Sequence, residues 1–320
     1  MPIFDLSLEQ LEKYDGCNER PSDIDAYWDR AISQMEAMGT GCELIPISEK
    51  YPGVECFDLY FTGVGNARIH SRLVRPSIRN GKLPAVCVFH GYGGSCGSFT
   101  SLFKWAAAGF VAVAMSCRGQ AGRSEDTISV RGNTLHGQII RGLDDPDPDK
   151  MYFRNVYLDT AQLARIIMAM DEVDATRVAA TGGSQGGGLT LACAALTPSL
   201  NRAAPVHPFL CDYRRVWNMD LDVGAYEELR QYFRGFDPRH LREKEIYTRL
   251  GYIDNQHIAH RIRARVKMFT GLMDTICPPS TQFAAYNKIT SPKEVVIYPD
   301  FGHEYYPDHD DLIMSFLCEM

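Results

Sequence analysis

The sequence lacks closely paired cysteines and clusters of cysteine and histidine at the spacing of a metal site. None of its ten cysteines forms a Cys-x-x-Cys pair, and none has a histidine beside it at the spacing of a zinc site. His257 and His260 have helical spacing, but no third ligand lies near them in the sequence. Cys87 and Cys193 lie in apolar runs, where a free cysteine behaves as a small buried hydrophobe. We therefore predict reduced thiols, no metal and no organic cofactor.

Long hydrophobic runs and an excess of positive charge are also missing. No stretch reaches about 18 consecutive apolar residues, so we predict no membrane span. The segment Met1 to Tyr14 is acidic and lacks the basic and apolar regions of a secretory signal, so we expect a cytoplasmic protein. The net charge of -7 argues against a nucleic-acid partner, because phosphate binding requires clustered Lys and Arg.

The sequence does contain strands that alternate with helices over most of its 320 residues. Short, nearly continuous apolar runs are typical of strands that are buried on both faces of a parallel sheet. Helical patterns separate these runs, which predicts an α/β fold with a doubly wound, mostly parallel sheet. The expected strands are 84–89, 110–115, 177–181, 266–269 and 295–298, and the expected helices are 99–108, 155–170, 189–196 and 280–288.

We expect a single domain over residues 1–320, with two additions to this sheet. In the N-terminal extension, residues 1–80, Ser22 is a candidate N-cap for a helix that ends at Gly39, and alternating segments that follow indicate a hairpin. Residues 207–260 are charged and aromatic and interrupt the alternation. We interpret them as a helical insertion over the carboxyl ends of the strands, where open α/β sheets bind ligands.

The motif Gly-x-Ser-x-Gly occurs at residues 182–186, directly after the expected strand 177–181 and before an apolar helix. This order is typical of the sharp turn that presents a nucleophilic serine in the α/β-hydrolase fold. The glycines leave room for the backbone of the turn, and Ser184 is the predicted nucleophile. The motif also occurs by chance, and its position between strand and helix is what favours the functional interpretation.

A second glycine-rich turn, His90 to Gly94, follows the expected strand 84–89. It resembles the loop that completes an oxyanion hole in this fold. We predict the backbone N–H groups of Tyr92 and Gln185 as the two oxyanion donors. An ordinary strand-to-helix turn is the alternative.

The acid and the base of such a site follow the serine in the order acid, then histidine. Asp274 lies just after the expected strand 266–269, and His303 follows the expected strand 295–298. We predict His303 as general base and Asp274 as the acid that orients it. Asp300 is the rival acid, but it lies only three residues from His303 on the same loop. His207 and Pro208 are candidates for the wall of a substrate pocket, with a buried structural histidine as the alternative.

Three short motifs together resemble those of a known family. They are Arg118-Gly119-Gln120, the Gly-x-Ser-Gln-Gly turn that includes Gln185, and His303-Glu304. In this combination the sequence resembles the acetyl xylan esterase and cephalosporin C deacetylase group, the seventh carbohydrate esterase family. The likeness extends from about Asp5 to the end of the chain.

The resemblance implies a serine esterase that forms an acetyl-serine intermediate and acts on small acetylated substrates. Acetylated xylo-oligosaccharides and cephalosporin C are the expected substrates, and self-association as a homohexamer is also implied. We interpret Arg118, Gln120 and Glu304 as supports of the active-site loops, with Arg118 holding backbone carbonyls and a carboxylate such as that of Glu304. Direct substrate contact by Arg118 and Gln120 is the alternative. The run Pro205 to Phe209 departs from the family's usual aspartate-tyrosine-proline, which bears on the substrate range.

Two other functions remain open at this point. A peptidase of the same fold is the nearest rival enzyme, although such enzymes usually carry a large separate N-terminal domain that about eighty residues cannot supply. A binding protein that keeps the fold without catalysis is the other, and the presence of all three predicted catalytic side chains argues against it.

Overall fold

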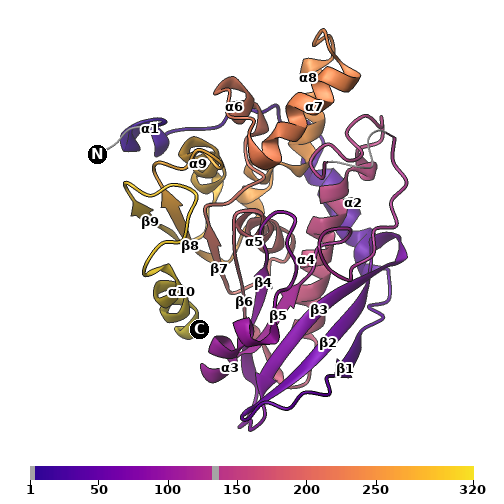
Figure 1. The fold of residues 1–320 in the computed structure, drawn as a ribbon, viewed down its shortest axis with the longest axis vertical. Helices are drawn as coiled ribbons and strands as arrows, with labels where there is room; N and C mark the ends of the chain where they lie inside the picture. The colour runs from indigo at the N-terminus through magenta and orange to yellow at the C-terminus, as the bar shows by residue number, and fades with distance from the viewer. Residues whose placement is uncertain (1–3, 132–136) are drawn as a thin grey trace.

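A single nine-stranded sheet forms the centre of the computed structural model, which describes residues 4–131 and 137–320 (Figure 1). The strand order is β1-β2-β3-β5-β4-β6-β7-β8-β9. The pairs from β1 to β5 along this order are antiparallel, and all pairs from β5 to β9 are parallel. The predicted α/β-hydrolase fold with a mostly parallel sheet is thus confirmed. The strands are β1 Glu43–Pro46, β2 Val54–Gly63, β3 Ala67–Pro76, β4 Leu83–Phe89, β5 Val111–Met115, β6 Val173–Gly183, β7 Arg202–Val206, β8 Arg265–Gly271 and β9 Lys293–Tyr298.

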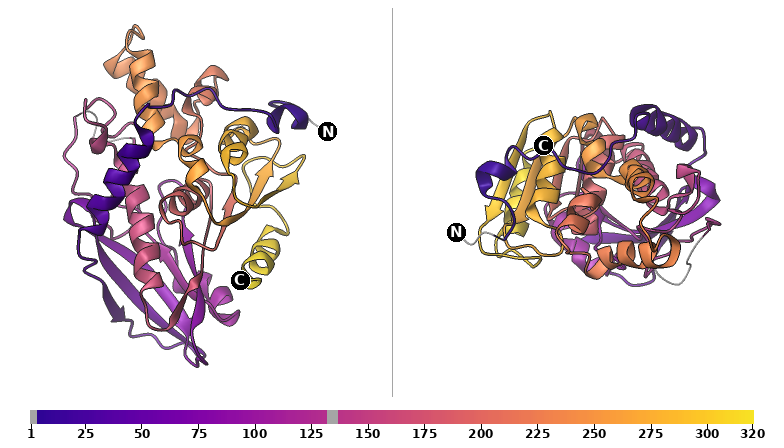
Figure 2. Two further views of the ribbon diagram at one scale, coloured as in Figure 1. Left: turned by 180° about the vertical axis from the view of Figure 1, so that it is seen from behind. Right: turned by 90° about the horizontal axis from the view of Figure 1, so that it is seen from above.

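Helices cover both faces of the sheet, so its central strands are buried on both sides. In β5 the side chains of Val111 and Val113 face one core, while Ala112 and Ala114 face the other. The first core includes side chains of α2, α4 and α5, and the second includes those of α3 and α10 (Figures 1 and 2). The helices are α1 Leu8–Leu11, α2 Ile24–Glu36, α3 Phe103–Ala107, α4 Tyr152–Met168, α5 Gln185–Leu196, α6 Tyr213–Asn218, α7 Glu227–Phe236, α8 Glu243–Leu250, α9 Pro279–Lys288 and α10 His309–Cys318.

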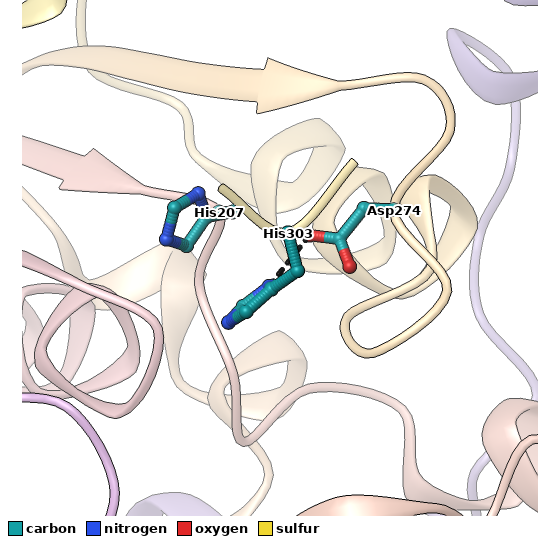
Figure 3. Close-up of side chains that lie close together, drawn as sticks. All are labelled: His207, Asp274 and His303. Carbon is teal, nitrogen blue, oxygen red and sulfur yellow. Dashed lines mark hydrogen bonds and ion pairs between the residues drawn. The ribbon is translucent and has the colours of Figure 1, made fainter. Parts of the chain in front are cut away.

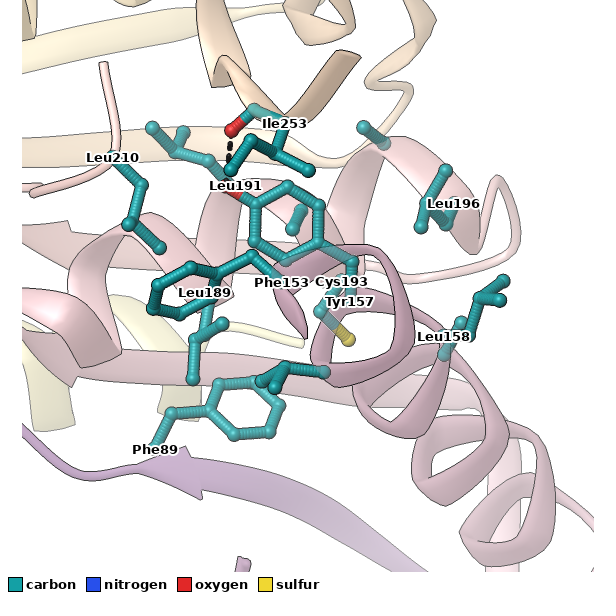
Figure 4. Close-up of a cluster of buried hydrophobic side chains, with 14 of the residues drawn as sticks. Phe89, Phe153, Tyr157, Leu158, Leu189, Leu191, Cys193, Leu196, Leu210 and Ile253 are labelled. Carbon is teal, nitrogen blue, oxygen red and sulfur yellow. Dashed lines mark hydrogen bonds between the residues drawn. The ribbon is translucent and has the colours of Figure 1, made fainter. Parts of the chain in front are cut away.

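The core on the α4 and α5 side fixes the helix that begins beside Ser184. Figure 4 shows Phe89 of β4 with Phe153 and Tyr157 of α4 and with Leu189 of α5. At most 2% of each of these side chains is exposed. The Tyr157 hydroxyl donates to the carbonyl of Ile253 at 2.8 Å, so the same core is tied to the segment between β7 and β8. Burying large aromatic groups contributes roughly 1.5–3 kcal/mol each, which holds α5 rigidly against the sheet.

The expected N-terminal hairpin is formed by β2 and β3, which pair in register up to Gly63 and Ala67. The expected helix is α2, but its N-cap is Asp23 and not Ser22, and it ends at Glu36, before Gly39. The expected helix 99–108 is wrong in part, because its first turn, Phe99–Leu102, is a 3-10 helix and only Phe103–Ala107 is α-helical.

The segment between β7 and β8 carries α6, α7 and α8, which project beyond the sheet at one end of the molecule (Figures 1 and 2). Its first residues reach the glycine-rich turn after β4, because the ring of Phe209 packs edge-to-face on Tyr92 with 5.7 Å between centroids. This contact joins the segment to the predicted oxyanion loop.

Within the described ranges, no helix combines the length and the apolar character that crossing a bilayer requires.

Candidate active site

Ser184 lies at a sharp turn between β6 and α5. Its backbone has φ 59° and ψ -119°, a conformation that non-glycine residues rarely adopt and that is often found at functional sites. Its N–H donates to the carbonyl of Val206 at 3.0 Å. A Cβ on Gly182 would come within 2.4 Å of the Phe89 carbonyl oxygen, and one on Gly186 within 2.1 Å. Both glycines are therefore required by the close approach of β4 to this turn.

The structure brings Ser184, His303 and Asp274 together in one hydrogen-bonded chain. The Nε2 atom of His303 is 3.0 Å from the Ser184 hydroxyl, and its Nδ1 atom is 2.8 Å from Oδ2 of Asp274. Asp274 is fully buried, and its other oxygen accepts N–H groups of Ile276 and Cys277 at 2.9 and 2.7 Å. A carboxylate only accepts hydrogen bonds, so the proton of the imidazole lies on Nδ1. The lone pair on Nε2 is thus directed at the serine hydroxyl.

The two predicted oxyanion donors lie in the turns after β4 and β6, which are neighbouring strands of the sheet. Gln185 is the first residue of α5, where a backbone N–H has no partner within the helix. In the described part of the chain, the backbone N–H groups of Tyr92 and Gln185 have no hydrogen-bond partner. The positive end of the α5 dipole adds to the attraction for a developing negative charge.

Gln120 connects the two turns through its side chain. Its carbonyl oxygen accepts the N–H of Gly93 at 2.9 Å, and its amide donates to Oε1 of Gln185 at 2.8 Å and to the Tyr152 hydroxyl at 3.0 Å. The side chain of Gln120 therefore bonds to a neighbour of Tyr92 and to Gln185 itself. Such bonds restrain the backbone groups predicted to bind an oxyanion.

Arg118 does not contact Glu304, so the predicted pairing of these two residues is wrong. The guanidinium of Arg118 is fully buried and binds both oxygens of Asp159 on α4 at 2.7 Å, with a further bond to the carbonyl of Val64 at 3.1 Å. Glu304 instead accepts the N–H of Gly302 at 2.9 Å. A fully buried guanidinium needs a carboxylate that is buried with it, and Asp159 is fully buried, whereas Glu304 is exposed.

His207 lies directly beside the imidazole of His303, with 4.3 Å between ring centroids (Figure 3). Its Nδ1 atom bonds to the Tyr306 hydroxyl at 3.1 Å. Burial, and then the neighbouring His303 and His309, lowers the pKa of His207 to about 3, so the imidazole is neutral near pH 7. Pro208 packs against the backbone of Gly187 at the start of α5.

A cavity of about 520 Å³ opens between α3 and α10 and reaches this pair of histidines. Of the residues predicted to act on the substrate, only His303 lines it, together with the pocket candidate His207. Gly182 and Gly183, which precede the serine, also lie in its wall. The cavity therefore approaches the catalytic histidine from the α3 and α10 side of the sheet.

Ligand atoms of His207, Asp274 and His303 lie within 4.8 Å of one another, which is close enough to bridge a metal ion (Figure 3). Both oxygens of Asp274 and both nitrogens of His303 already have protein partners. Because these atoms already have hydrogen-bond partners, we interpret Asp274 and His303 as part of a proton-transfer chain that includes Ser184.

The proximity of His207 to His303 and the role of Asp159 as partner of Arg118 were missed by sequence reasoning. The position of His207 after a strand end did predict it in the pocket wall, and it lines the cavity, but this signal did not indicate its contact with His303. Asp159 lies within a helix, and nothing in its spacing indicates an arginine partner.

The whole chain, residues 1–320, matches the acetyl xylan esterase family (AXE1). The acetyl esterase Axe7A of Xylanibacter ruminicola is 29% identical over 309 residues, which cover 93% of this chain and 66% of that relative. The chain thus spans just under two thirds of that relative's length.

Solved structures give closer matches. Acetyl xylan esterase 1 from Thermoanaerobacterium sp. JW/SL YS485 is 52% identical, with a TM-score of 0.97 over 99% of both chains. The acetyl xylan esterase from Paenibacillus sp. R4 is 37% identical, with a TM-score of 0.92 over 98% of this chain and 99% of that one. A dienelactone hydrolase from Klebsiella pneumoniae, at 18% identity and a TM-score of 0.54, shares the fold. The chain therefore belongs to the acetyl xylan esterase family.

Proposed function

We propose that this protein is a serine carboxylesterase that removes acetyl groups from small acetylated substrates. The match to the acetyl xylan esterase family supports acetylated xylan fragments as substrates, and the resemblance of the sequence suggests small xylo-oligosaccharides and cephalosporin C. The observation that carries the proposal is the bonded chain from the Ser184 hydroxyl through His303 to the buried carboxylate of Asp274.

The proposed mechanism follows from this chain of bonds. As the Ser184 oxygen attacks the acetyl carbon, Nε2 of His303 accepts the hydroxyl proton, and the carbonyl oxygen becomes an oxyanion. The backbone N–H groups of Tyr92 and Gln185 bind that oxyanion. The C–O bond to the sugar then breaks, and His303 returns its proton to the departing oxygen.

The second half of the reaction repeats these steps with water. His303 takes a proton from water, the hydroxide attacks the acetyl-serine, and acetate leaves as the serine regains its proton. Asp274 stabilises the imidazolium that forms twice in each cycle. In this mechanism Gln120 and Arg118 hold the loops and do not contact the substrate, and His207 forms part of the pocket wall.

The test is Ser184→Ala, with Ser199→Ala as the matched control because Ser199 is exposed beyond the end of α5. We expect Ser184→Ala to lose at least a thousandfold in kcat on p-nitrophenyl acetate and to resist a fluorophosphonate probe. Ser199→Ala should keep the wild-type kcat and react with the probe. Full activity in Ser184→Ala would refute the mechanism. A series of esters from acetate to octanoate, followed by acetylated xylo-oligosaccharides, then measures the acyl limit and the substrate class.

We also propose a cytoplasmic location and self-association as a homohexamer. The ten free cysteines support a reducing compartment. The hexamer is supported by the family resemblance alone, and the mass of a single chain in light scattering would contradict it.

A further inference from the structure

A second arrangement of nucleophile, imidazole and carboxylate lies outside the Ser184 site. The thiol of Cys96, in the loop after β4, is 3.8 Å from Nδ1 of His70 on β3. The Nε2 atom of the same imidazole is 2.7 Å from Oδ1 of Asp58 on β2. Cys96 is 8% exposed and His70 is 2% exposed. Three residues from three different parts of the chain thus line up in the order thiol, base and acid.

The hydrogen bonds fix the proton of His70 on the side away from the thiol. The Asp58 carboxylate can only accept, so Nε2 carries the proton and Nδ1 presents a lone pair to Cys96. Burial lowers the pKa of His70 below its usual value of 6.5, although Asp58 opposes this effect. The imidazole is therefore neutral near pH 7 and able to accept the thiol proton.

Two arginines lie at the Asp58 end of the group, and one of them also reaches the residue after Cys96. The guanidinium of Arg72 donates to the carbonyl of Gly97, next to Cys96, and lies 3.9 Å from Asp58. Arg123 binds the other oxygen of Asp58 at 3.2 Å. Among the described residues, His70 also contacts the ring of Tyr60 and, through its backbone N–H, the hydroxyl of Ser124, and both are uncharged. Nearby cations stabilise a thiolate, as they do in reactive cysteines.

A route to the thiol also exists. Cys96 lines the cavity of about 520 Å³ that opens between α3 and α10, and His207 and His303 line the same cavity. A small molecule that enters this space can reach the sulfur, and once attached it would stand in the cavity that borders the catalytic histidine. A cysteine with a mainly structural role would need neither the oriented imidazole nor this opening.

We propose that Cys96 is an activated thiol that soft carbon electrophiles alkylate, and that the attached group slows ester hydrolysis from the cavity beside His303. With an α-halo amide, the Cys96 sulfur forms a bond to the methylene carbon while the carbon–halogen bond breaks and halide leaves with its electron pair. The thiol proton passes to Nδ1 of His70 and then to solvent. The effect on hydrolysis rests on the proposed function, whereas the reactivity of the thiol does not.

Iodoacetamide is the probe for the reactivity of the thiol. The native protein is treated at pH 7 for increasing times and quenched, and the remaining thiols are labelled after unfolding, so that mass spectrometry of peptides gives the alkylation rate at each cysteine. The exposed Cys318 and the buried Cys193 are internal references. We expect Cys96 to react faster than Cys318 and at least tenfold faster than Cys193. Protection of Cys96 equal to that of Cys193 would overturn the proposal.

The pH dependence and one variant test the role of the imidazole. Below its pKa, an unassisted thiol gains about tenfold in rate for each pH unit. From pH 6 to 8 we expect the alkylation rate to gain much less at Cys96 than at the exposed Cys318. Asp58→Asn should slow Cys96 at least tenfold, while Asp29→Asn, a change at an exposed position on α2, should leave it unchanged. A tenfold gain per pH unit at Cys96, unaffected by Asp58→Asn, would also overturn the proposal.

Two further variants separate this site from the esterase. Ser184→Ala should alkylate at Cys96 at the wild-type rate even though hydrolysis is lost. Alkylation of the wild-type protein should lower p-nitrophenyl acetate turnover several-fold, and the same treatment of Cys96→Ser should not. Equal losses of turnover in the wild type and Cys96→Ser would refute the effect on hydrolysis, since the modified residue would then lie elsewhere.

Discussion

The two oxygens of Asp274 have different partners, and this difference determines what the residue does at the scale of a single side chain. One oxygen accepts two backbone N–H groups and the other accepts the Nδ1 proton of His303. The carboxylate is therefore held in one orientation by bonds that do not involve the imidazole. It can fix the tautomer of His303 without itself moving.

Asp274→Asn is predicted to lower kcat by about 10⁴ without unfolding the protein. The N–H groups of Ile276 and Cys277 would select the amide oxygen as their acceptor, so the NH₂ group would face His303. The imidazole would then carry its proton on Nε2 and could not accept the proton of Ser184. Rates on p-nitrophenyl acetate measure the loss of kcat, and the thermal unfolding midpoint shows whether the variant stays folded. Asp311→Asn, at an exposed position of α10 outside the cavity wall, is the control, and comparable activity in the two variants would contradict the role of Asp274.

Site residues at the ends of strands could be predicted from the sequence, whereas the buried partner of Arg118 could not. Ser184, Asp274 and His303 each follow a recognisable apolar strand, and the carboxyl ends of parallel strands meet at one edge. Asp159 lies 41 residues from Arg118 and inside a helix, where an acidic residue usually indicates a solvated face. Its partner depends on how α4 packs against the sheet, which local patterns do not specify.

Among whole elements, the central strands could be predicted because both their faces are buried. The edge strand β1 could not, since all four of its residues are exposed and their sequence has no buried face. The 3-10 turn before α3 was missed because a short apolar stretch does not distinguish 3.0 from 3.6 residues per turn. The positions of α6 to α8 depend on contacts with distant loops, such as that of Phe209 with Tyr92.

Helix α7 holds a neighbouring loop through one buried carboxylate. Glu228 is 7% exposed and accepts the N–H groups of Gln138, Ile139 and Ile140 at 2.7, 2.7 and 3.3 Å. Burial raises the pKa of Glu228 to about 7, and the three N–H groups oppose this rise only in part. The folded protein therefore binds a proton at Glu228 between pH 7 and 4.5, where the unfolded chain does not.

It follows that protonation of Glu228 stabilises the fold as the pH falls through this window. Between pH 7.5 and 5.5 we expect the wild type to gain about 2 kcal/mol in unfolding free energy relative to Glu228→Gln. Urea unfolding of both proteins at the two pH values measures this difference. The exposed neighbour gives the control Glu227→Gln, which should follow the wild type. A constant difference between the wild type and Glu228→Gln at both pH values would show that the carboxyl of Glu228 has an ordinary pKa.

For the molecule as a whole, buried titratable groups act on stability in opposite directions over the same pH range. Burial, and then the neighbouring Asp212, raises the pKa of Asp254, so like Glu228 it favours the fold on acidification. The pKa values of His207 and His257 are lowered to about 3, chiefly by burial, so these histidines favour the unfolded chain on acidification. Buried carboxyls and buried histidines thus act on stability in opposite directions, and their individual effects should emerge in single variants.

His257 has no role in the proposed mechanism, so its replacement tests how protonation of a buried histidine changes the stability of the fold. His257 is 3% exposed. Burial, and then the positive charges of Lys288 and Arg20, lowers its pKa and keeps the imidazole neutral. The unfolded chain takes up a proton at this residue near pH 6.5 and the folded protein does not, which costs the fold about 1.4 kcal/mol between pH 7.5 and 5.5. Between pH 7.5 and 5.5, the unfolding free energy of His257→Gln should therefore gain about 1.4 kcal/mol relative to that of the wild type, whatever the stability of the variant at pH 7.5.

Urea unfolding at both pH values measures this change. The control is His240→Gln, which removes an exposed imidazole. If the stabilities of His257→Gln and the wild type change equally between pH 7.5 and 5.5, the folded protein must protonate His257 readily. Buried histidines would then not oppose buried carboxyls in the pH dependence of stability.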